Sequence, residues 1–402
     1  MQFKNIIGQA DTKEQLAQMI QHNRLSHALL FLGKEGSGGL SLAMAFAQYI
    51  VCEKVNNKKA ADAGPSLFGE PEPTEQIPLT DSCGVCSACI KAEKLIHPDI
   101  HFSFPAVTKK SGSSPISTDY IAEWREFATV NPYGNVYDWL QFIKAENKQG
   151  NITANECNDI IRKLSLKSFE SEYKILIMWM PEFLGKEGNK LLKLIEEPPP
   201  NTLFIFVAEN EGMILQTILS RTQLVKIAPL TNTDIEVALE LKSGVKIEKA
   251  TQIAILSEGN YREALQLLQH AEDDWNGLLR EWLNAIVRTG PAAQVKWIED
   301  ISKEGREKQK QFLKYFTHLL EQAIRLRTIE QQTTDNEQPN PETDFALRLN
   351  KLCTISQQDA IITELDKASY YIERNANAKM LFHALSIKLY HIISNNSLIL
   401  AN

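Results

Sequence analysis

Four cysteines in the first quarter of the chain have the types and spacing of a metal site. Cys83, Cys86 and Cys89 form a C-x2-C-x2-C run, and Cys52 lies upstream of it. Zinc prefers four thiolate ligands in a closed, tetrahedral structural site, and Gly84 allows the tight turn that brings two sulfurs to one ion. The spacing therefore predicts a structural Zn2+. An iron–sulfur cluster and unmetallated buried thiols are the alternatives that the pattern leaves open.

A glycine-rich segment has the outline of a phosphate-binding loop, G-x-x-x-x-G-K-[ST]. Gly33 and Gly38 stand at its two glycine positions, with Gly36 between them. However, Gly39 replaces the lysine that would contact the phosphates, and Leu40 replaces the hydroxyl residue that would hold Mg2+. We therefore expect that ATP and Mg2+ are not bound productively. A strand-to-helix turn unrelated to nucleotides is the alternative, because glycine patterns alone are weak signals.

The second motif of a working ATPase, an acidic pair after a buried strand, is also changed. Trp179 and Met180 follow the apolar run 175–178, in the places of a metal-binding Asp and a water-activating Glu. Glu182 comes two positions too late. Two independent motifs have thus lost their reactive groups but kept their framework, which predicts a nucleotide-hydrolase fold without hydrolysis.

These motifs lie within an alternation of predicted strands and helices. Compact apolar runs predict strands at 27–32, 173–180 and 203–208. Apolar positions at helical spacing predict helices at 40–50, 155–164, 189–197 and 213–219. Such alternation is typical of a parallel sheet covered by helices, so we expect an α/β fold of the P-loop NTPase kind.

Beyond about Pro229 only helices are predicted, and the pattern indicates three domains. They are an α/β domain at 1–228 with the zinc module inserted at about 52–97, a small helical unit at 229–271 and a larger helical domain at 272–402. The polar stretch 53–82 has the character of an insertion. The stretch 105–150 is rich in aromatic residues, and we expect it to pack inward.

The composition is that of an ordinary globular protein and excludes several classes. The 402 residues carry 43 Lys and Arg against 50 Asp and Glu, and this net charge of −7 argues against a generally cationic nucleic-acid-binding protein. Six cysteines are too few for a secreted disulfide scaffold. The N-terminus lacks the apolar core of a signal peptide, and no apolar run approaches the roughly 20 residues of a membrane span. We therefore expect a cytoplasmic protein with no membrane partner.

Several segments together resemble the delta-prime family of bacterial DNA polymerase III clamp-loader subunits. The most specific match is 189–199, Asn-Lys-Leu-Leu-Lys-Leu-Ile-Glu-Glu-Pro-Pro. The other matching segments are Ile7-Gly8-Gln9, 24–31, the four cysteines with His97-Pro98-Asp99, 217–222 and 259–265. The resemblance covers about residues 1–270.

The resemblance implies an AAA+ module, a helical lid (229–271) and a helical collar that joins subunits (272–402). It implies the gamma/tau ATPase subunits and the delta subunit as partners, with a sliding clamp and primed DNA bound through the assembled ring. Delta-prime subunits are typically those without ATPase activity, in agreement with the changed motifs. A label of DNA polymerase would reflect membership of the complex, because nothing in the chain resembles a polymerase active site.

Two arginines gain a role from the same resemblance. Ser220-Arg221-Thr222 looks like the family's Ser-Arg-Cys motif, whose arginine reaches the ATP of a neighbouring subunit. Such an arginine finger neutralises charge that develops on the γ-phosphate, and the guanidinium carries the effect whether Cys or Thr222 follows it. Arg262 matches the family's second sensor arginine, and a purely structural lid contact is its alternative.

Two other functions remain open at this point. Gly39, Trp179 and Met180 oppose an active ATPase of the gamma/tau type. A zinc-containing nucleic-acid-binding protein has little support beyond Lys109-Lys110 and scattered basic residues. We therefore expect a non-hydrolysing clamp-loader subunit that scaffolds the ring and donates Arg221.

Overall fold

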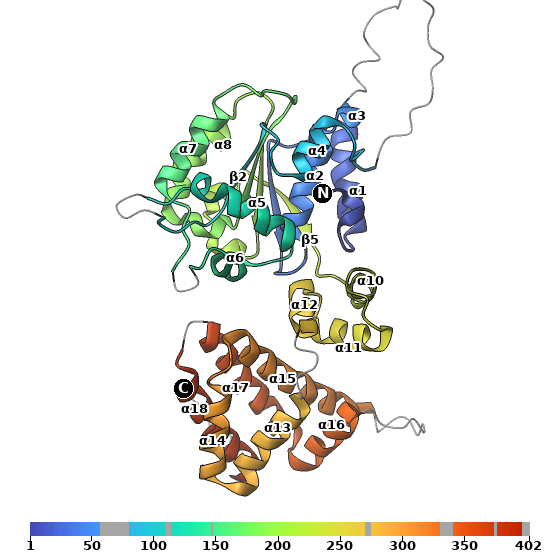
Figure 1. Cartoon of the computed structure of the whole chain (residues 1–402), viewed down its shortest axis with the longest axis vertical. Coiled ribbons are helices and arrows are strands. Elements are labelled where there is room, and N and C mark those ends of the chain that lie inside the picture. Colours follow the sequence, from blue (N-terminus) through green and yellow to red (C-terminus); the bar gives the residue numbers. More distant parts are fainter. Residues whose placement is uncertain are drawn as a thin grey trace, which may run out of the picture. The chain divides into compact units, whose positions relative to one another are not determined.

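The computed structural model describes residues 1–56, 80–109, 114–145, 148–269, 275–329, 341–373 and 376–395. The chain forms two compact units, Met1–Leu268 and Gln269–Asn402. Figure 1 shows a sheet with helices on both faces in the first unit and helices in the second. Most of the insertion predicted at 53–82, and the predicted boundary at 271, lie outside the described residues.

Five parallel strands form the sheet, in the order β2-β3-β4-β1-β5. They are β1 (Ala28–Gly33), β2 (Ile100–Ser103), β3 (Lys174–Trp179), β4 (Thr202–Ala208) and β5 (Gln223–Ile227). In the register, Leu29 of β1 lies opposite Ile205 of β4, and Leu30 lies opposite Leu224 of β5. Because all strands are parallel, their carboxyl ends share one edge, where the glycine loop and Trp179 meet.

The central strands are buried on both faces. In β4, Leu203, Ile205 and Val207 join one core, while Phe204 and Phe206 join the other. Successive side chains of a strand point to opposite faces, so a strand with helices on both sides is apolar throughout. This explains why its sequence is a continuous apolar run.

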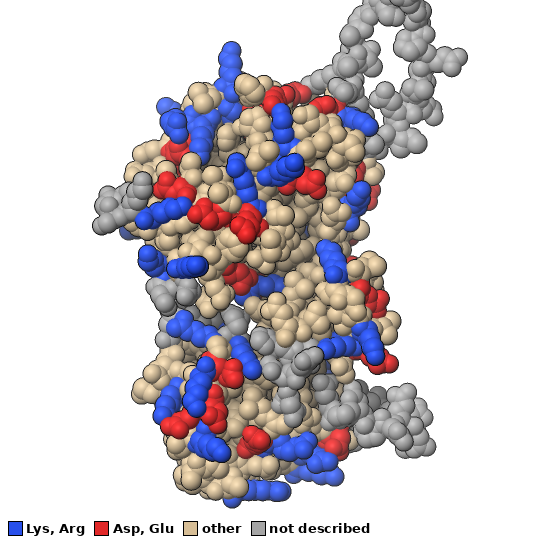
Figure 2. Space-filling model, viewed as in Figure 1, with Lys and Arg blue, Asp and Glu red and all other residues tan. Residues whose placement is uncertain are grey.

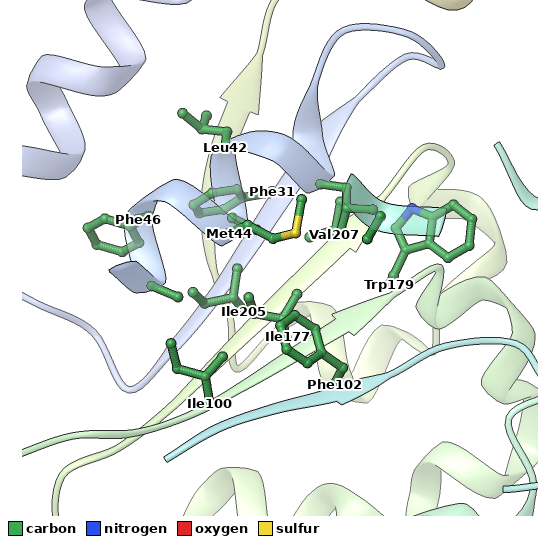
Figure 3. Packing of buried hydrophobic residues seen from close by; sticks show 14 of the residues in the cluster. Phe31, Leu42, Met44, Phe46, Ile100, Phe102, Ile177, Trp179, Ile205 and Val207 are labelled. Atoms are coloured by element: carbon green, nitrogen blue, oxygen red, sulfur yellow. The ribbon is translucent and has the colours of Figure 1, made fainter. Parts of the chain in front are cut away.

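Helices cover both faces of the sheet (Figure 1). The core on one face includes residues of α1 (Ala10–Gln21), α2 (Gly39–Val51), α4 (Ser87–Glu93), α5 (Ile121–Val130) and α6 (Val136–Phe142). The core on the other face includes residues of α7 (Ala154–Leu164), the 3-10 segment η4 (Pro181–Leu191), α8 (Leu192–Glu196) and α9 (Gln216–Leu219). Shorter elements are η1 (Phe3–Asn5), α3 (Glu53–Asn56), η3 (Ser117–Tyr120) and η5 (Glu211–Met213). Figure 3 shows Met44 and Phe46 of α2 among the apolar side chains of the sheet.

Three further helices complete the first unit. They are α10 (Asn232–Ser243), α11 (Ile247–Ser257) and α12 (Tyr261–Gln269). Their buried residues include Ile235 and Ile253, and the same core contains Ile7 and Tyr133 from the α/β part. We call α10 to α12 the lid segment. Its core is therefore continuous with residues that border the glycine loop.

The second unit is a helical bundle in the residues that are described. Its helices are α13 (Trp275–Asn284), the π-helical turn η6 (Ala285–Thr289), α14 (Pro291–Ile301), α15 (Arg306–Ile329), α16 (Pro341–Leu352), α17 (Ile355–Glu373) and α18 (Ala378–Asn395). Trp282 and Trp297 stack at 4.8 Å between ring centroids, beside Phe312 and Phe382. Among the described helices of the whole chain, none has both the length and the apolar character that crossing a bilayer requires.

The expected α/β class is confirmed, and so is the inward packing of the stretch 105–150. Trp124 and Trp139 are fully buried there, and their rings meet edge to face at 5.4 Å. The helix predicted at 189–197 is wrong in its first three residues. Only Leu192–Glu196 is α-helical, and the chain before it is the 3-10 segment η4, which is broken at Gly185 with φ 49° and ψ −138°.

Candidate functional site

The glycine loop joins β1 to α2 and keeps the backbone shape of a tight turn. Gly36 and Gly38 have φ of +71° and +90°, and Gly38 is the N-cap residue of α2. The Ser37 hydroxyl donates a hydrogen bond of 2.5 Å to the Lys34 carbonyl. Gly39 is the first residue of α2, so no side chain at that position can reach toward a phosphate.

The residues that replace the acidic pair belong to the apolar core. Trp179 is 3 % exposed and lies 5.2 Å from Trp124 and 6.1 Å from Phe127, ring centroid to centroid. Met180 is 7 % exposed and has φ 58°. Neither side chain offers an oxygen ligand for Mg2+ or a base that could accept a proton from water. The α5 helix, which supplies Trp124 and Phe127, is the element that keeps Trp179 buried.

Glu182 has a structural partner instead of a catalytic one. Its Oε1 accepts hydrogen bonds from the backbone N–H groups of Glu209, at 2.7 Å, and Asn210, at 2.9 Å. Burial raises the pKa of Glu182. Glu209 follows β4, and burial, reinforced by the charges of Glu35 and Glu182, raises its pKa to about 8. Both carboxyl groups therefore favour the protonated form more than an ordinary glutamate does.

A small pocket that is open to solvent lies above the loop. It is lined by the loop together with Tyr133, Trp179, Met180 and Glu209, and its volume is about 30 Å³. Tyr133 approaches the loop closely, because a Cβ at Gly38 would lie 2.8 Å from its ring.

Arg262 of α12 enters the same region from the lid segment. Its Nε and Nη2 donate to the two carboxylate oxygens of Asp138, at 2.5 and 2.6 Å, and its Nη1 donates to Glu35 at 3.0 Å. The side chain of Arg262 is 6 % exposed. Asp138 and Glu35 were not singled out from the sequence, since the sequence does not show which carboxylate a distant arginine meets.

Arg221 lies at the surface, after α9. Its Nε donates to Glu196 Oε1 at 2.7 Å, its Nη2 also pairs with Glu196, and its Nη1 donates to the Thr217 carbonyl at 2.8 Å. The hydroxyls of Ser220 and Thr222 donate to the carbonyls of Thr217 and Leu219 and so bind the turn to α9. The guanidinium is thus oriented by α8 and α9 while its side chain stays 34 % exposed.

The four cysteines come together as predicted. The sulfurs of Cys52, Cys83, Cys86 and Cys89 all lie within 4.8 Å of one another, and those of Cys83 and Cys89 are 3.9 Å apart. A tetrahedral zinc site with Zn–S bonds of about 2.3 Å separates its sulfurs by about 3.8 Å. Cys52 ends α2 and Cys86 is the N-cap residue of α4, so two helix ends fix the cluster.

Backbone N–H groups point at these sulfurs, as thiolates require. Cys83 N donates to Cys52 Sγ at 3.3 Å, and Cys86 N donates to Cys83 Sγ at 3.4 Å. Cys89 N donates to Cys86 Sγ at 3.4 Å. The hydrogen bond from the Cys89 thiol lowers the pKa of Cys52, and the same pairing raises the pKa of Cys89. The donor set fits a zinc ion, which would deprotonate all four thiols.

A comparison with protein families places this geometry in context. Residues 8–231 match the model of a family described as "DNA polymerase III, delta subunit". The chain belongs to this family. The match includes the glycine loop, the cysteine cluster and Arg221, and the AAA+ fold expected from the resemblance agrees with the parallel sheet and its helices.

Known relatives are similar over part of their length. DNA polymerase III subunit delta' of Bacillus subtilis is 26% identical over 63% of this chain and 57% of its own length. Subunit tau of the same organism is 24% identical over 76% of this chain and 44% of its length. This chain thus spans about half of these relatives. A solved DNA polymerase III gamma subunit-related protein of Thermotoga maritima has a TM-score of 0.40 at 15% identity, over 95% of this chain and 99% of that one.

Proposed function

We propose that this chain is a non-hydrolysing clamp-loader subunit of the delta-prime type. The observation that carries the proposal is the combination of family membership with a nucleotide site that has lost both of its reactive motifs. Gly39 removes the phosphate-binding lysine, and Trp179 and Met180 are buried where the acidic pair would be. In this proposal the chain itself has no ATPase activity and contributes to DNA replication through its complex.

Its proposed partners are the gamma/tau ATPase subunits and the delta subunit, with the sliding clamp and primed DNA engaged through the assembly. We assign residues 229–271 to a lid and 272–402 to a collar that joins subunits. We further assign Arg221 as an arginine finger that reaches the ATP of a neighbouring subunit. Its exposure and its orientation by Glu196 and Thr217 support this assignment.

Replacing Arg221 with Ala tests the finger. An arginine finger is worth about 10³ to 10⁵ in rate at the site that it reaches. We expect the R221A chain to assemble normally with the other subunits. The total ATPase rate of the assembled loader should fall by the contribution of the one neighbouring ATP site that Arg221 reaches. R162A is the matched control, because Arg162 is an exposed arginine in a helical ion pair with Asp159. An R221A loader with the wild-type rate would rule out the finger.

The alternative of an active gamma/tau-like ATPase is favoured by several relatives, which are the tau subunit of Bacillus subtilis and gamma or gamma/tau subunits of other bacteria. It requires a phosphate-binding lysine and an acidic pair, and Gly39 and the buried Trp179 and Met180 do not supply them. Steady hydrolysis of Mg-ATP by the purified chain alone would support this alternative and contradict our proposal.

We also propose that the four cysteines hold one structural Zn2+. Cys52 and Cys86 lie at the ends of α2 and α4, so a bound ion would fasten these two helices to each other. A structural zinc site contributes directly to folding free energy. The proposed role is therefore to stabilise the first unit on the α2 side of the sheet.

A further inference from the structure

The lid segment contacts the glycine loop directly. Tyr261 N, at the start of α12, donates to the Gly36 carbonyl at 3.2 Å. A Cβ placed on Gly36 would lie 1.8 Å from Asn260 Oδ1 and 3.0 Å from Asn260 Cα. A side chain at Gly36 would thus collide with the side chain of Asn260 and crowd the lid backbone behind it, at a residue whose φ of +71° already favours glycine.

The contact between the lid segment and the glycine loop includes a buried guanidinium that is paired with two carboxylates. Arg262 makes a bidentate hydrogen bond to Asp138 and a third hydrogen bond to Glu35. Asn135 and Asn260 donate to Glu35 at 3.1 and 3.4 Å, so this carboxylate joins the loop, α6 and the lid. Bidentate arginine–carboxylate pairs are strong and geometrically specific, and a guanidinium paired in this way has three of its five N–H groups directed at carboxylates of its own chain.

Each side of the contact is held in place by its own element. Asp138 and Asn135 form a reciprocal capping box at the start of α6, and α6 is fixed by the fully buried Trp139. Tyr133, from the same stretch, packs edge to face on Tyr261 at 5.0 Å and accepts a hydrogen bond from Ile7 N at 3.0 Å. The stretch 105–150 therefore supplies the partner for Arg262 on a rigid support.

We propose that Arg262, Asp138 and Glu35 form a permanent latch that holds the lid segment on the glycine loop without nucleotide. Asp138 and Glu35 accept hydrogen bonds from the Arg262 guanidinium, which could otherwise bind an anion. The docked lid segment covers the loop and so excludes phosphates from it. The proposal goes beyond the proposed function, because it concerns the state of this chain alone and is independent of Arg221. It assigns a task to the aromatic-rich stretch that contains α6, which is to hold the lid segment in place where a ligand would otherwise do so.

Hydrogen–deuterium exchange on the full chain, read by mass spectrometry, tests the latch. In the wild-type chain we expect the amides of α12 to be protected without nucleotide and unchanged by Mg-ATP. In D138A the buried guanidinium loses its main partner, and removing one member of a buried pair is strongly destabilising. We expect exchange in α12 to rise by about two orders of magnitude while exchange in β4 stays unchanged.

A second variant and a control keep the test decisive. E35Q retains the side-chain shape and removes one charge, so exchange in α12 should rise by a smaller factor of about ten. D159A breaks the two ion pairs that Asp159 makes with Arg162 and Lys163 on α7, and it should leave α12 unchanged. The proposal is overturned if D138A leaves α12 protected, if β4 loses protection equally, or if Mg-ATP slows exchange of α12 in the wild-type chain.

Discussion

At the scale of single residues, the carboxyl groups around the loop should make stability depend on pH. Burial raises the pKa of Glu209 to about 8, with Glu35 and Glu182 adding to the shift and Arg262 opposing it. Between about 4.5 and 8 the unfolded chain gives up this proton while the folded chain keeps it. The folded state therefore binds more protons in this range, and its stability falls as the pH rises through it.

The variant E209Q isolates this effect. We expect the wild-type chain to lose about 1 to 3 kcal/mol of unfolding free energy between pH 5 and pH 8 relative to E209Q, as measured by chemical denaturation at both pH values. Other titrating groups are common to both proteins and cancel in the comparison. Equal pH dependence in the two proteins would show that Glu209 is ionised throughout.

The cysteine cluster yields a second prediction at this scale. We expect about one zinc per chain, and C89S should lose it because three thiolates no longer close the tetrahedron. C353S is the control, since Cys353 is buried in the second unit, away from the cluster in sequence. Zinc affinity should fall with decreasing pH, because protons compete for the thiolates. Iron with visible absorbance, in place of zinc, would support the iron–sulfur alternative.

At the scale of elements, restoring the lysine should not restore the nucleotide site. A Cβ at Gly39 would lie 3.2 Å from Val207 Cγ1 and 3.4 Å from Ile227 Cδ1, so in the variant G39K these buried side chains of β4 and β5 must shift. We expect a stability loss of about 1 to 3 kcal/mol and no binding of Mg-ATP by calorimetry. G305K is the control, because nothing lies within 4 Å of a Cβ at Gly305. Micromolar binding of Mg-ATP by G39K would show that the missing lysine alone disables the loop.

The elements also show what the sequence could predict and what it could not. The strands β1, β3 and β4 were predicted because they are buried on both faces and read as continuous apolar runs. The strand β2 has four residues and includes His101, and β5 is an edge strand with exposed Gln223, Leu224 and Lys226. Neither carries the pattern of a buried strand, so both were missed.

The candidate site also contains residues that the sequence could predict and residues that it could not. Cys83, Cys86 and Cys89 share one short run, so spacing alone predicted their meeting. Asp138 and Arg262 lie 124 positions apart, and the local pattern at 135–138 indicates only the start of a helix. Their pairing depends on how the lid docks, which no local signal contains. The assignment of Arg221 stays a prediction, since it concerns a neighbouring subunit.

At the scale of the whole molecule, charge predicts weak contact with nucleic acid. The net charge is −7, and Figure 2 shows Lys and Arg interspersed with Asp and Glu on the face that it displays. DNA affinity comes largely from released counterions, with a slope in log–log plots against salt of about −0.9 per neutralised phosphate. We expect the purified chain to bind duplex DNA weakly and with a shallow salt slope, as measured by fluorescence anisotropy.

The outcome separates two functions. A steep slope of about −5 or more, together with submicromolar affinity at physiological salt, would favour the zinc-containing nucleic-acid-binding protein. The anisotropy series should include C89S, because the loss of DNA binding together with zinc would assign the binding to the cysteine module.

The close approach of Asn260 to Gly36 has a consequence for how genomes are surveyed. A glycine-spaced loop between a strand and a helix is commonly counted as evidence of an energy-consuming enzyme. In this chain the Asn260 side chain of the lid segment occupies the space beside Gly36, so a methyl group added there would be destabilising for a reason unrelated to phosphate binding. Genome annotation that relies on glycine spacing alone will therefore overestimate the number of ATPases, unless it also considers which residues occupy the space above the loop.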